Sequence, residues 1–298
     1  MMLTTSQLRQ SASLSGVRDI GSIEIDVLLT HLLQLFHERE LTGHLAFKGG
    51  TFLRKMVFGP RGRLSTDLDF TCRTDISLDD LTMRILEALD QPYHGIGFRF
   101  DRDKDWYLTE DGCAANPVCV HEGNTTGVKI KIQVSMREYP ILPVREIPQI
   151  DQSYFKFLAF APARIPSLAI EEVIAEKIRA ASQRSKIRDL YDLAEISRRP
   201  LNHKAIRSLV VLKLWQGGGA GWDFDRFRRR IEAGEEYDVK DLQNLLRKDQ
   251  KPDLAKMIER VCCEFRFLEK LSEIEQRLAG DAAKRLRKEA AGLRKELE

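Results

Sequence analysis

The sequence has no apolar run approaching ~18 residues, so we expect no helix that spans a membrane. Residues 1–16 are polar and carry no hydrophobic signal-peptide core, and we therefore expect a cytoplasmic protein. The five cysteines are odd in number and show no Cys-x-x-Cys spacing, which argues for reduced thiols and against a structural zinc site. The net charge is only +3, so any surface for nucleic acid must come from local clusters of basic residues.

The pattern of hydrophobic residues changes along the 298-residue chain and divides it into two lobes. Before Arg164, short apolar runs predict strands, and residues 128–136 alternate strictly between apolar and polar side chains. Prolines then punctuate the sequence, and beyond them apolar residues recur at helical spacing. We therefore expect a bilobal α+β fold. Its core lobe, residues 1–165, holds a small mixed sheet with flanking helices, and residues 166–298 form a helical lobe.

Residues 47–70 combine a glycine pair with two closely spaced carboxylates. Gly49 and Gly50 follow an apolar run, and without Cβ atoms their backbone can approach an anion closely. Asp67 and Asp69 lie two residues apart, so in a strand both side chains share one face while their apolar neighbours point into the core. These like charges repel unless a cation lies between them, and Mg²⁺ often binds one or two carboxylates together with substrate phosphates. The stretch predicts a site for a nucleoside triphosphate and its metal; the alternative is a hairpin turn followed by a solvated strand face.

These residues resemble the first motif of nucleotidyltransferases of the DNA polymerase beta type, and in particular the AbiEii toxins of abortive-infection and type IV toxin–antitoxin systems. The second half of that signature is a helix with a lysine and then an Arg-Asp-x-x-Asp turn, which Lys177 and residues 188–192 match. The resemblance implies a Mg²⁺-dependent enzyme, with Mn²⁺ as the alternative metal, that moves a nucleoside monophosphate from a triphosphate to an acceptor hydroxyl. It also implies a toxin with a cognate antitoxin encoded nearby. The implied acceptor is RNA, expected to be the 3′ end of tRNA, so that the reaction blocks translation and growth.

The resemblance assigns roles to particular residues of both motifs. The metal ligands are Asp67 and Asp69. The catalytic residues are these two together with Lys177, Asp189 and Asp192, and the choice between Asp189 and Asp192 for acting on the acceptor hydroxyl stays open. The nucleotide-binding residues are Lys48, Gly49, Gly50, Thr51, Arg54, Ser65 and Lys177.

Local spacing offers plainer interpretations of the second motif. The helical neighbours of Lys177 at three and four residues are apolar, so an anion that pairs with it must come from elsewhere; the alternative is a surface lysine. Arg188 and Asp192 have the spacing of an ion pair within one helix.

One position departs from the superfamily pattern. The strand at 128–136 is expected to carry a third carboxylate beside the pair, but Gln133 occupies that position. Either a third acid comes from elsewhere or two acids suffice with substrate phosphates. Two other function classes therefore stay open, a nucleotidyltransferase that modifies a small molecule and an inactive member that only binds nucleotide. Basic residues that could form an RNA-binding patch around the site, or else a solvated face, are Arg54, Lys55, Arg61, Arg63, Lys129, Lys131 and Arg137.

Overall fold

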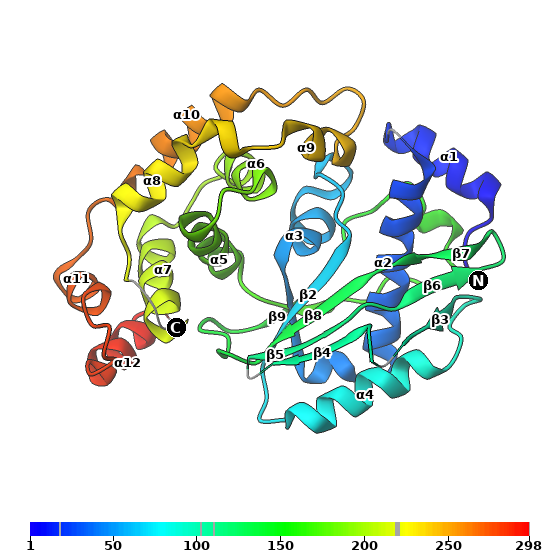
Figure 1. Ribbon diagram of the computed structural model, residues 1–298, viewed down its shortest axis with the longest axis horizontal. Coiled ribbons are helices and arrows are strands. Elements are labelled where there is room, and N and C mark those ends of the chain that lie inside the picture. The colour runs from blue at the N-terminus through cyan, green and yellow to red at the C-terminus, as the bar shows by residue number, and fades with distance from the viewer. Residues whose placement is uncertain (18, 102, 110, 218–220, 298) are drawn as a thin grey trace. The chain divides into compact units, whose positions relative to one another are not determined.

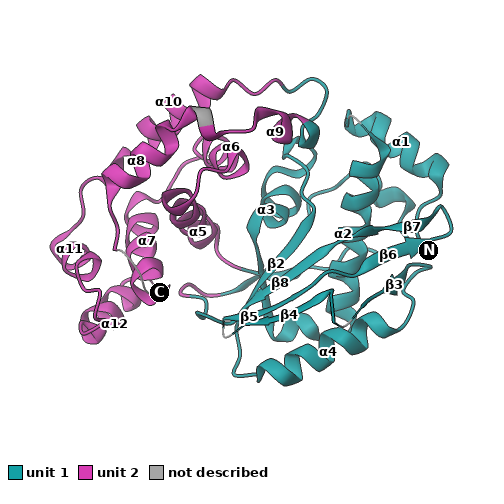
Figure 2. Ribbon diagram, viewed as in Figure 1, with its two compact units in different colours: residues 1–140, 144–167, 244–250 teal, residues 141–143, 168–243, 251–298 magenta. Residues whose placement is uncertain are grey.

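The computed structural model describes residues 1–298 except 18, 102, 110, 218–220 and 298 (Figure 1). It contains two compact units (Figure 2). Unit 1 comprises residues 1–140, 144–167 and 244–250, and unit 2 comprises residues 141–143, 168–243 and 251–298. In the described part of the chain, no helix has the length and hydropathy that a membrane span requires. The five cysteines are free thiols.

A mixed sheet forms the centre of unit 1. Its central strand β2 runs antiparallel to β1 on one side and parallel to β8 on the other, which places segments far apart in sequence side by side. Phe47 and Phe70 from these strands pack with Phe36 from the helix beneath them, with ring centroids 5.4 to 5.7 Å apart. Across this sheet, the described strands follow the order β4 (Trp106–Thr109), β5 (Gly112–Ala115), β8 (Lys131–Ser135), β2 (Asp67–Cys72), β1 (Leu45–Lys48), β10 (Ile165–Ser167) and β9 (Arg145–Ile147).

The strand predicted at 128–136 is in fact two strands that belong to different sheets. β7 (Asn124–Lys129) pairs with β6 (Val118–His121) in a smaller sheet that also contains β3 (Gly97–Arg99), whereas β8 pairs with β2 and β5. The break falls at Ile130, which is fully buried and donates its backbone N–H to Pro117. The alternation of side chains continues through the break, so periodicity alone does not reveal it.

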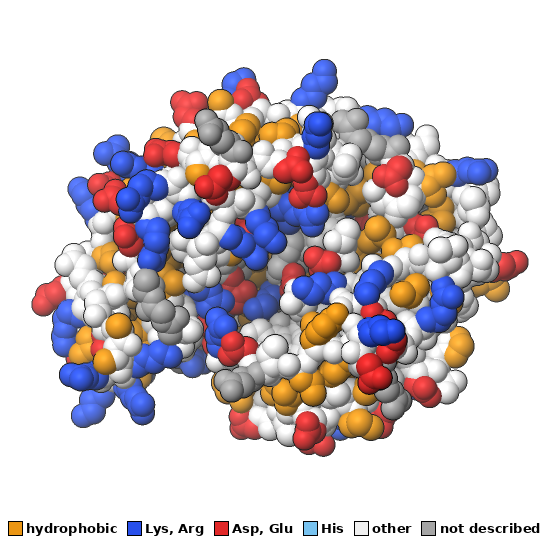
Figure 3. All heavy atoms as spheres, viewed as in Figure 1, with side chains coloured by type: hydrophobic (Ala, Val, Ile, Leu, Met, Phe, Trp, Pro, Cys, Tyr) orange, Lys and Arg blue, Asp and Glu red, His pale blue; other side chains and the backbone are white. Residues whose placement is uncertain are grey.

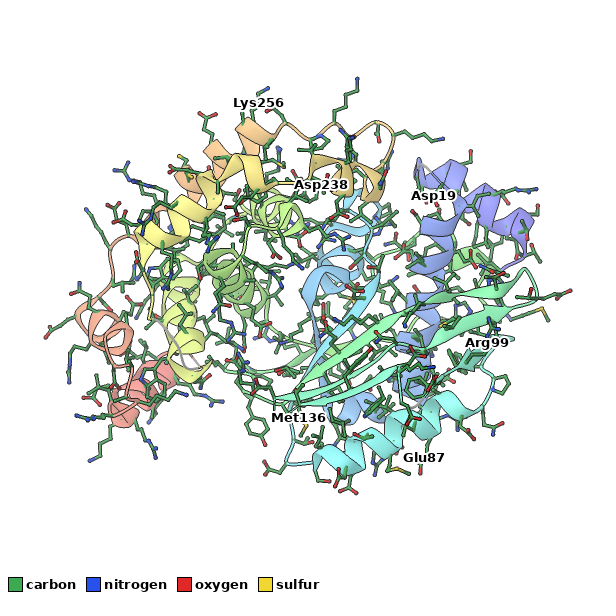
Figure 4. The ribbon with its side chains drawn as sticks, viewed as in Figure 1. Asp19, Glu87, Arg99, Met136, Asp238 and Lys256 are labelled. Atoms are coloured by element: carbon green, nitrogen blue, oxygen red, sulfur yellow. The ribbon has the colours of Figure 1, made fainter. Side chains whose placement is uncertain are left out.

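Helices pack around the two sheets of unit 1. The long helix α2 (Ile20–Glu38) begins at Asp19, whose carboxylate accepts the Ser22 N–H at 2.9 Å (Figure 4). Helix α4 (Leu78–Asp90) begins at Ser77, whose hydroxyl accepts the Asp80 N–H, and it contacts β5 (Figure 1). The remaining helical segments of this unit are α1 (Thr5–Ser15), η1 (Leu41–Gly43), α3 (Gly49–Phe52), the π-helical segment η2 (Leu53–Phe58), η3 (Gly59–Arg61) and η4 (Phe155–Phe157).

The regular secondary structure described in unit 2 is entirely helical. Helix α5 (Ile170–Gln183) packs against α6, α7 and α8 through its apolar face. Ser167 is the last residue of β10, where it pairs with Phe47, and the helix begins at Ile170. The other helices are α6 (Ile187–Ile196), α7 (His203–Gly217), α8 (Phe224–Glu232), η5 (Gly234–Glu236), α9 (Val239–Leu245), α10 (Leu254–Glu264), η6 (Arg266–Leu268), α11 (Glu273–Ala279) and α12 (Arg287–Lys295); the end of α9 belongs to unit 1.

Candidate active site

Strand β2 presents the two predicted carboxylates on one face. Asp67 and Asp69 are partly exposed, whereas Leu68 and Phe70 between and after them are buried, as the period of two predicts. The parallel register with β8 sets Gln133 beside Asp69, in the position expected for a third carboxylate. The hydroxyl of Thr66 donates to Asp67 Oδ1 at 3.1 Å. The predicted pair is therefore formed, with an amide rather than an acid on the neighbouring strand.

The glycine pair lies directly against this face. Gly49 has a φ of +81°, which favours glycine, and a Cβ atom there would overlap the carboxylate of Asp69. A Cβ at Gly50 would lie 2.5 Å from Arg63 Nη2 and 3.3 Å from Ser65 Oγ. Gly49 therefore requires glycine, whereas at Gly50 the nearest atom is the end of the flexible Arg63 side chain; both glycines pack against side chains that follow later in the chain.

Other nucleotide-binding candidates lie in the same turn. The hydroxyl of Thr51 donates to the backbone carbonyl of Asp67, which ties α3 to the start of β2. Lys48 is the residue opposite Asp69 in the antiparallel register between β1 and β2. The structure thus brings Lys48, Thr51 and the carboxylate pair together, with Ser65 buried beside Gly50.

The donor set fits a hard cation that also binds phosphate. Among the described residues, no group of three or more His, Cys, Asp or Glu side chains is placed to hold a metal ion. Mg²⁺ does not need such a group, because one or two carboxylates with substrate phosphates and water complete its shell of oxygen ligands. Asp67 and Asp69 on one partly exposed face meet that requirement.

Arg54 and Lys55 do not form the exposed basic patch that the sequence suggested. Their side chains are buried, with exposed fractions of 2% and 0%, and both form ion pairs with Asp26 on α2. Arg54, predicted to bind nucleotide, also donates to the carbonyl oxygens of Gly59 and Gly62. The π-helical segment η2 turns both side chains into the core, and local sequence does not show this because the counter-charge lies 28 and 29 residues upstream.

The second predicted motif forms an ion-pair cluster within unit 2. Lys177 Nζ on α5 lies 2.9 Å from Asp189 Oδ1 and 2.8 Å from Asp192 Oδ2, both on α6. Arg184 Nε lies 3.0 Å from the other oxygen of Asp189. The anions that pair with Lys177 thus come from outside its own helix, as we predicted, and the alternative of a surface lysine is wrong because Lys177 is only 14% exposed.

Charge in this cluster sets the protonation of one carboxyl group. Burial alone would raise the pKa of Asp189, but the charges of Lys177 and Arg184 and their hydrogen bonds lower it to about 2. Arg188 pairs with Asp241 on α9 through two parallel contacts of 2.8 and 2.9 Å. Asp238 accepts the first free N–H groups of α9 and so helps to place Asp241 (Figure 4).

A second buried cluster in unit 2 was missed by sequence reasoning. Lys213 on α7 is fully buried and lies 2.7 Å from Glu172 and 3.1 Å from Glu176, the residue before Lys177. Glu172 also accepts the backbone N–H groups of Ile141 and Leu142. No spacing signal in the sequence links Glu172, in the first turn of α5, to a lysine 41 residues away.

Comparison with known proteins identifies the family of this chain. The model of the AbiEii family, described as nucleotidyltransferase toxins of type IV toxin–antitoxin systems, matches residues 31–284. MenT4, a nucleotidyltransferase toxin of Mycobacterium tuberculosis H37Rv, is 26% identical and aligns over 99% of each chain with a TM-score of 0.82. Two solved structures from Helicobacter pylori are less similar. One covers 86% of this chain and 96% of its own at 19% identity and a TM-score of 0.47, and JHP933 covers 91% and 97% at 19% and 0.46.

A search of curated proteins finds no match to this sequence. The family match covers most of the chain and includes both sequence motifs, and the similarity to MenT4 extends over both units. The chain is therefore a nucleotidyltransferase with the α+β fold of these toxins, and it belongs to the AbiEii family of type IV toxin–antitoxin systems.

Proposed function

We propose that this toxin transfers a nucleoside monophosphate from a triphosphate to the 3′ end of tRNA, using Mg²⁺ bound by Asp67 and Asp69, with Mn²⁺ as the alternative metal. The observation that carries the proposal is the contact between the glycine turn and the carboxylate pair. Gly49 leaves no room for a Cβ beside Asp69, so backbone amides and carboxylates share one face. Amides suit phosphate oxygens, and carboxylates suit the metal that accompanies them.

The site residues of unit 1 then each have a role in holding the triphosphate. The backbone of Gly49 and Gly50 and the hydroxyl of Ser65 contact phosphate oxygens, with Lys48 adding positive charge beside Asp69. Mg²⁺ bound by the carboxylates would supply the charge that stabilises the attacking and leaving oxygens of an in-line displacement. Catalysis by this chain's own residues is then mainly positioning, since phosphoryl transfer needs little covalent chemistry from the protein.

We also propose roles in the reaction for Lys177 and its two aspartates. We assign to Lys177 the neutralisation of phosphate charge. Asp189 contacts two cations and has a pKa of about 2, so it holds a proton poorly and its role is to orient Lys177. Between the two aspartates that the sequence left open, we therefore propose Asp192, which contacts Lys177 at 2.8 Å, as the carboxylate that acts on the acceptor hydroxyl.

The acceptor is bound by fewer basic residues than the sequence suggested. Lys129 pairs with Asp105 at 2.7 Å and Arg137 with Asp111, so both are partly neutralised. Lys131 is exposed and lies beside Asp67 in the register of β2 and β8, which makes it the basic residue best placed to contact RNA phosphates near the carboxylates. On the face shown in Figure 3, acidic and basic side chains are interspersed, in agreement with the low net charge.

The family also implies partners. A type IV system provides an antitoxin, which we expect to be encoded nearby, and the enzyme class requires a nucleoside triphosphate. A tRNA acceptor would place the protein in the cytoplasm.

The test is incubation of purified protein with each of the four labelled triphosphates, bulk RNA and Mg²⁺, followed by mapping of tRNA 3′ ends. Extended tRNA ends support the proposal, and omission of the divalent metal should abolish the label. Label in another RNA refutes the tRNA acceptor, and label only in small molecules refutes an RNA acceptor altogether.

A further inference from the structure

A buried ionic cluster in unit 1 joins α2 to the loop that contains the glycine pair. Asp26 on α2 is 1% exposed, and its two carboxylate oxygens contact Arg54 at 3.2 Å and Lys55 at 2.9 Å. Lys55 Nζ also donates to the hydroxyls of Thr30 and Tyr154, at 2.8 and 3.1 Å. Three charged groups are thus withdrawn from water in one place.

Arg54 extends this cluster to the far side of the loop. Its Nη1 donates to the carbonyl oxygens of Gly59, at 2.5 Å, and Gly62, at 3.0 Å. Gly62 is followed directly by Arg63 and Leu64 and then by Ser65, whose hydroxyl lies beside Gly50. The cluster therefore holds the chain just after the glycine pair and again just before it returns to the carboxylates on β2.

Stability alone is a poor reason for such a cluster. Burying charged groups is costly, and well-packed apolar residues of similar volume are often at least as stabilising as a buried ion pair. Unlike apolar packing, charge-assisted hydrogen bonds have a defined geometry, because each oxygen and N–H group holds its partner at a preferred distance and angle. Here the fixed partners are η2, which follows the glycine turn, and the carbonyl groups of Gly59 and Gly62, which precede the return of the chain to β2.

We propose that Asp26 is a positioning residue for the triphosphate, acting through Arg54 and Lys55. It holds the loop in the shape that presents Gly49, Gly50 and Ser65 to phosphate, without touching substrate itself. This inference depends on the proposed function, since it assumes that those three residues contact the triphosphate.

The test compares two buried acids on the same helix. Asp26→Asn removes the charge that holds Arg54 and Lys55. Glu24→Gln is the matched control, because Glu24 is also buried on α2 and lies within 2.8 Å of His121 and Asn124, which belong to the β6–β7 hairpin rather than to the loop. Triphosphate affinity is measured with a non-hydrolysable analogue and Mg²⁺, and KM, kcat and Tm are measured alongside.

Asp26→Asn should weaken triphosphate binding by ~10-fold or more and raise KM in parallel. Glu24→Gln should leave affinity within about twofold of the wild type, even if both variants melt at lower temperature. Equal affinities in the two variants would overturn the inference, because a merely structural role lowers Tm without a selective loss of binding.

Two further variants test the proposal if Asp26→Asn does not fold or if the proposed active site is wrong. If Asp26→Asn does not fold, Arg54→Lys keeps the positive charge but loses the planar fork that reaches two carbonyls and a carboxylate together. It should also weaken triphosphate binding, and wild-type affinity in it would refute the proposal. Asp69→Ala distinguishes failure of the proposed active site from failure of the positioning role. If Asp69→Ala stays active, the proposed active site is wrong. If Asp69→Ala is inactive but Asp26→Asn binds triphosphate normally, only the positioning role of Asp26 is refuted.

Discussion

The cluster around Lys177 predicts how the stability of unit 2 depends on pH. Lys177 bridges Asp189 and Asp192, whose side chains are only 4% and 2% exposed. Burial alone would raise the pKa of Asp189, but Lys177 and Arg184 lower it from 3.8 to about 2. A lowering of this size corresponds to roughly 2 to 3 kcal/mol of unfolding free energy. Replacing Lys177 by methionine should therefore remove about 2 to 3 kcal/mol of stability at pH 7, because it leaves two buried carboxylates with reduced compensation.

The sign of the pH effect follows from the direction of the shift. The folded state holds the proton on Asp189 less tightly than the unfolded state does, so this contribution is fully present above the ordinary pKa of 3.8. It is lost as the pH falls through about 2. The stability gap between the wild type and Lys177→Met should therefore be constant near neutral pH and should close on acidification across that range.

Urea unfolding followed by tryptophan fluorescence measures this gap. Trp215 and Trp222 lie in unit 2 and Trp106 in unit 1, so a Trp106→Phe background reports on unit 2 alone. Lys204→Met is the matched control, because Lys204 pairs with Glu296 on the surface, where both side chains are more than half exposed. Such exposed pairs contribute ~0–1 kcal/mol. If Lys177→Met unfolds like this control at pH 7, or if the gap does not change in acid, the electrostatic explanation is wrong.

Three further substitutions test the site on β2. Asp69→Ala should abolish nucleotide transfer and growth arrest while the melting temperature stays near that of the wild type; an active variant would contradict the metal assignment. Gly49→Ala should lower both Tm and triphosphate affinity, because the φ of +81° and the Asp69 carboxylate leave no room for a Cβ. Gly43→Ala is the control: a Cβ there meets open space, so neither Tm nor affinity should fall. Lys131→Glu should reduce tRNA extension more than triphosphate binding, as measured at two salt concentrations; equal losses would assign Lys131 to the triphosphate.

The parts of the site that the sequence predicted are those fixed by local geometry. Strand periodicity of two residues places Asp67 and Asp69 on one face and Leu68 in the core whatever the rest of the fold does. At Gly49 only the positive φ is a property of the local backbone, whereas the close approach comes from Asp69 on another strand. The apolar helical neighbours of Lys177 likewise predicted that its anion comes from elsewhere, and in the structure Asp189 and Asp192 on α6 are such anions.

The parts that the sequence could not predict depend on contacts between distant segments. A basic pair such as Arg54 and Lys55 is interpreted as exposed by default, and only the fold shows that both meet a buried Asp26. The break at Ile130 leaves the alternation of side chains intact, so the change from one sheet to another has no signal in the pattern. Long-range pairing decides both cases, and pairing partners are not encoded in any single window of sequence.

The carboxylate face of β2 also shows why an amide is compatible with metal binding at the position expected for a third acid. Lys48 lies opposite Asp69 and Lys131 lies beside Asp67, so each acid has a basic neighbour one strand away. Opposite charges in such cross-strand positions contribute ~0.2–1 kcal/mol each and offset the repulsion between the two acids. The four side chains together are neutral, so a divalent cation bound there, as we propose, would make the face positive and attract a polyanionic triphosphate. Because Gln133 is uncharged, it preserves this balance, whereas a third carboxylate would cancel half of the charge that the cation brings.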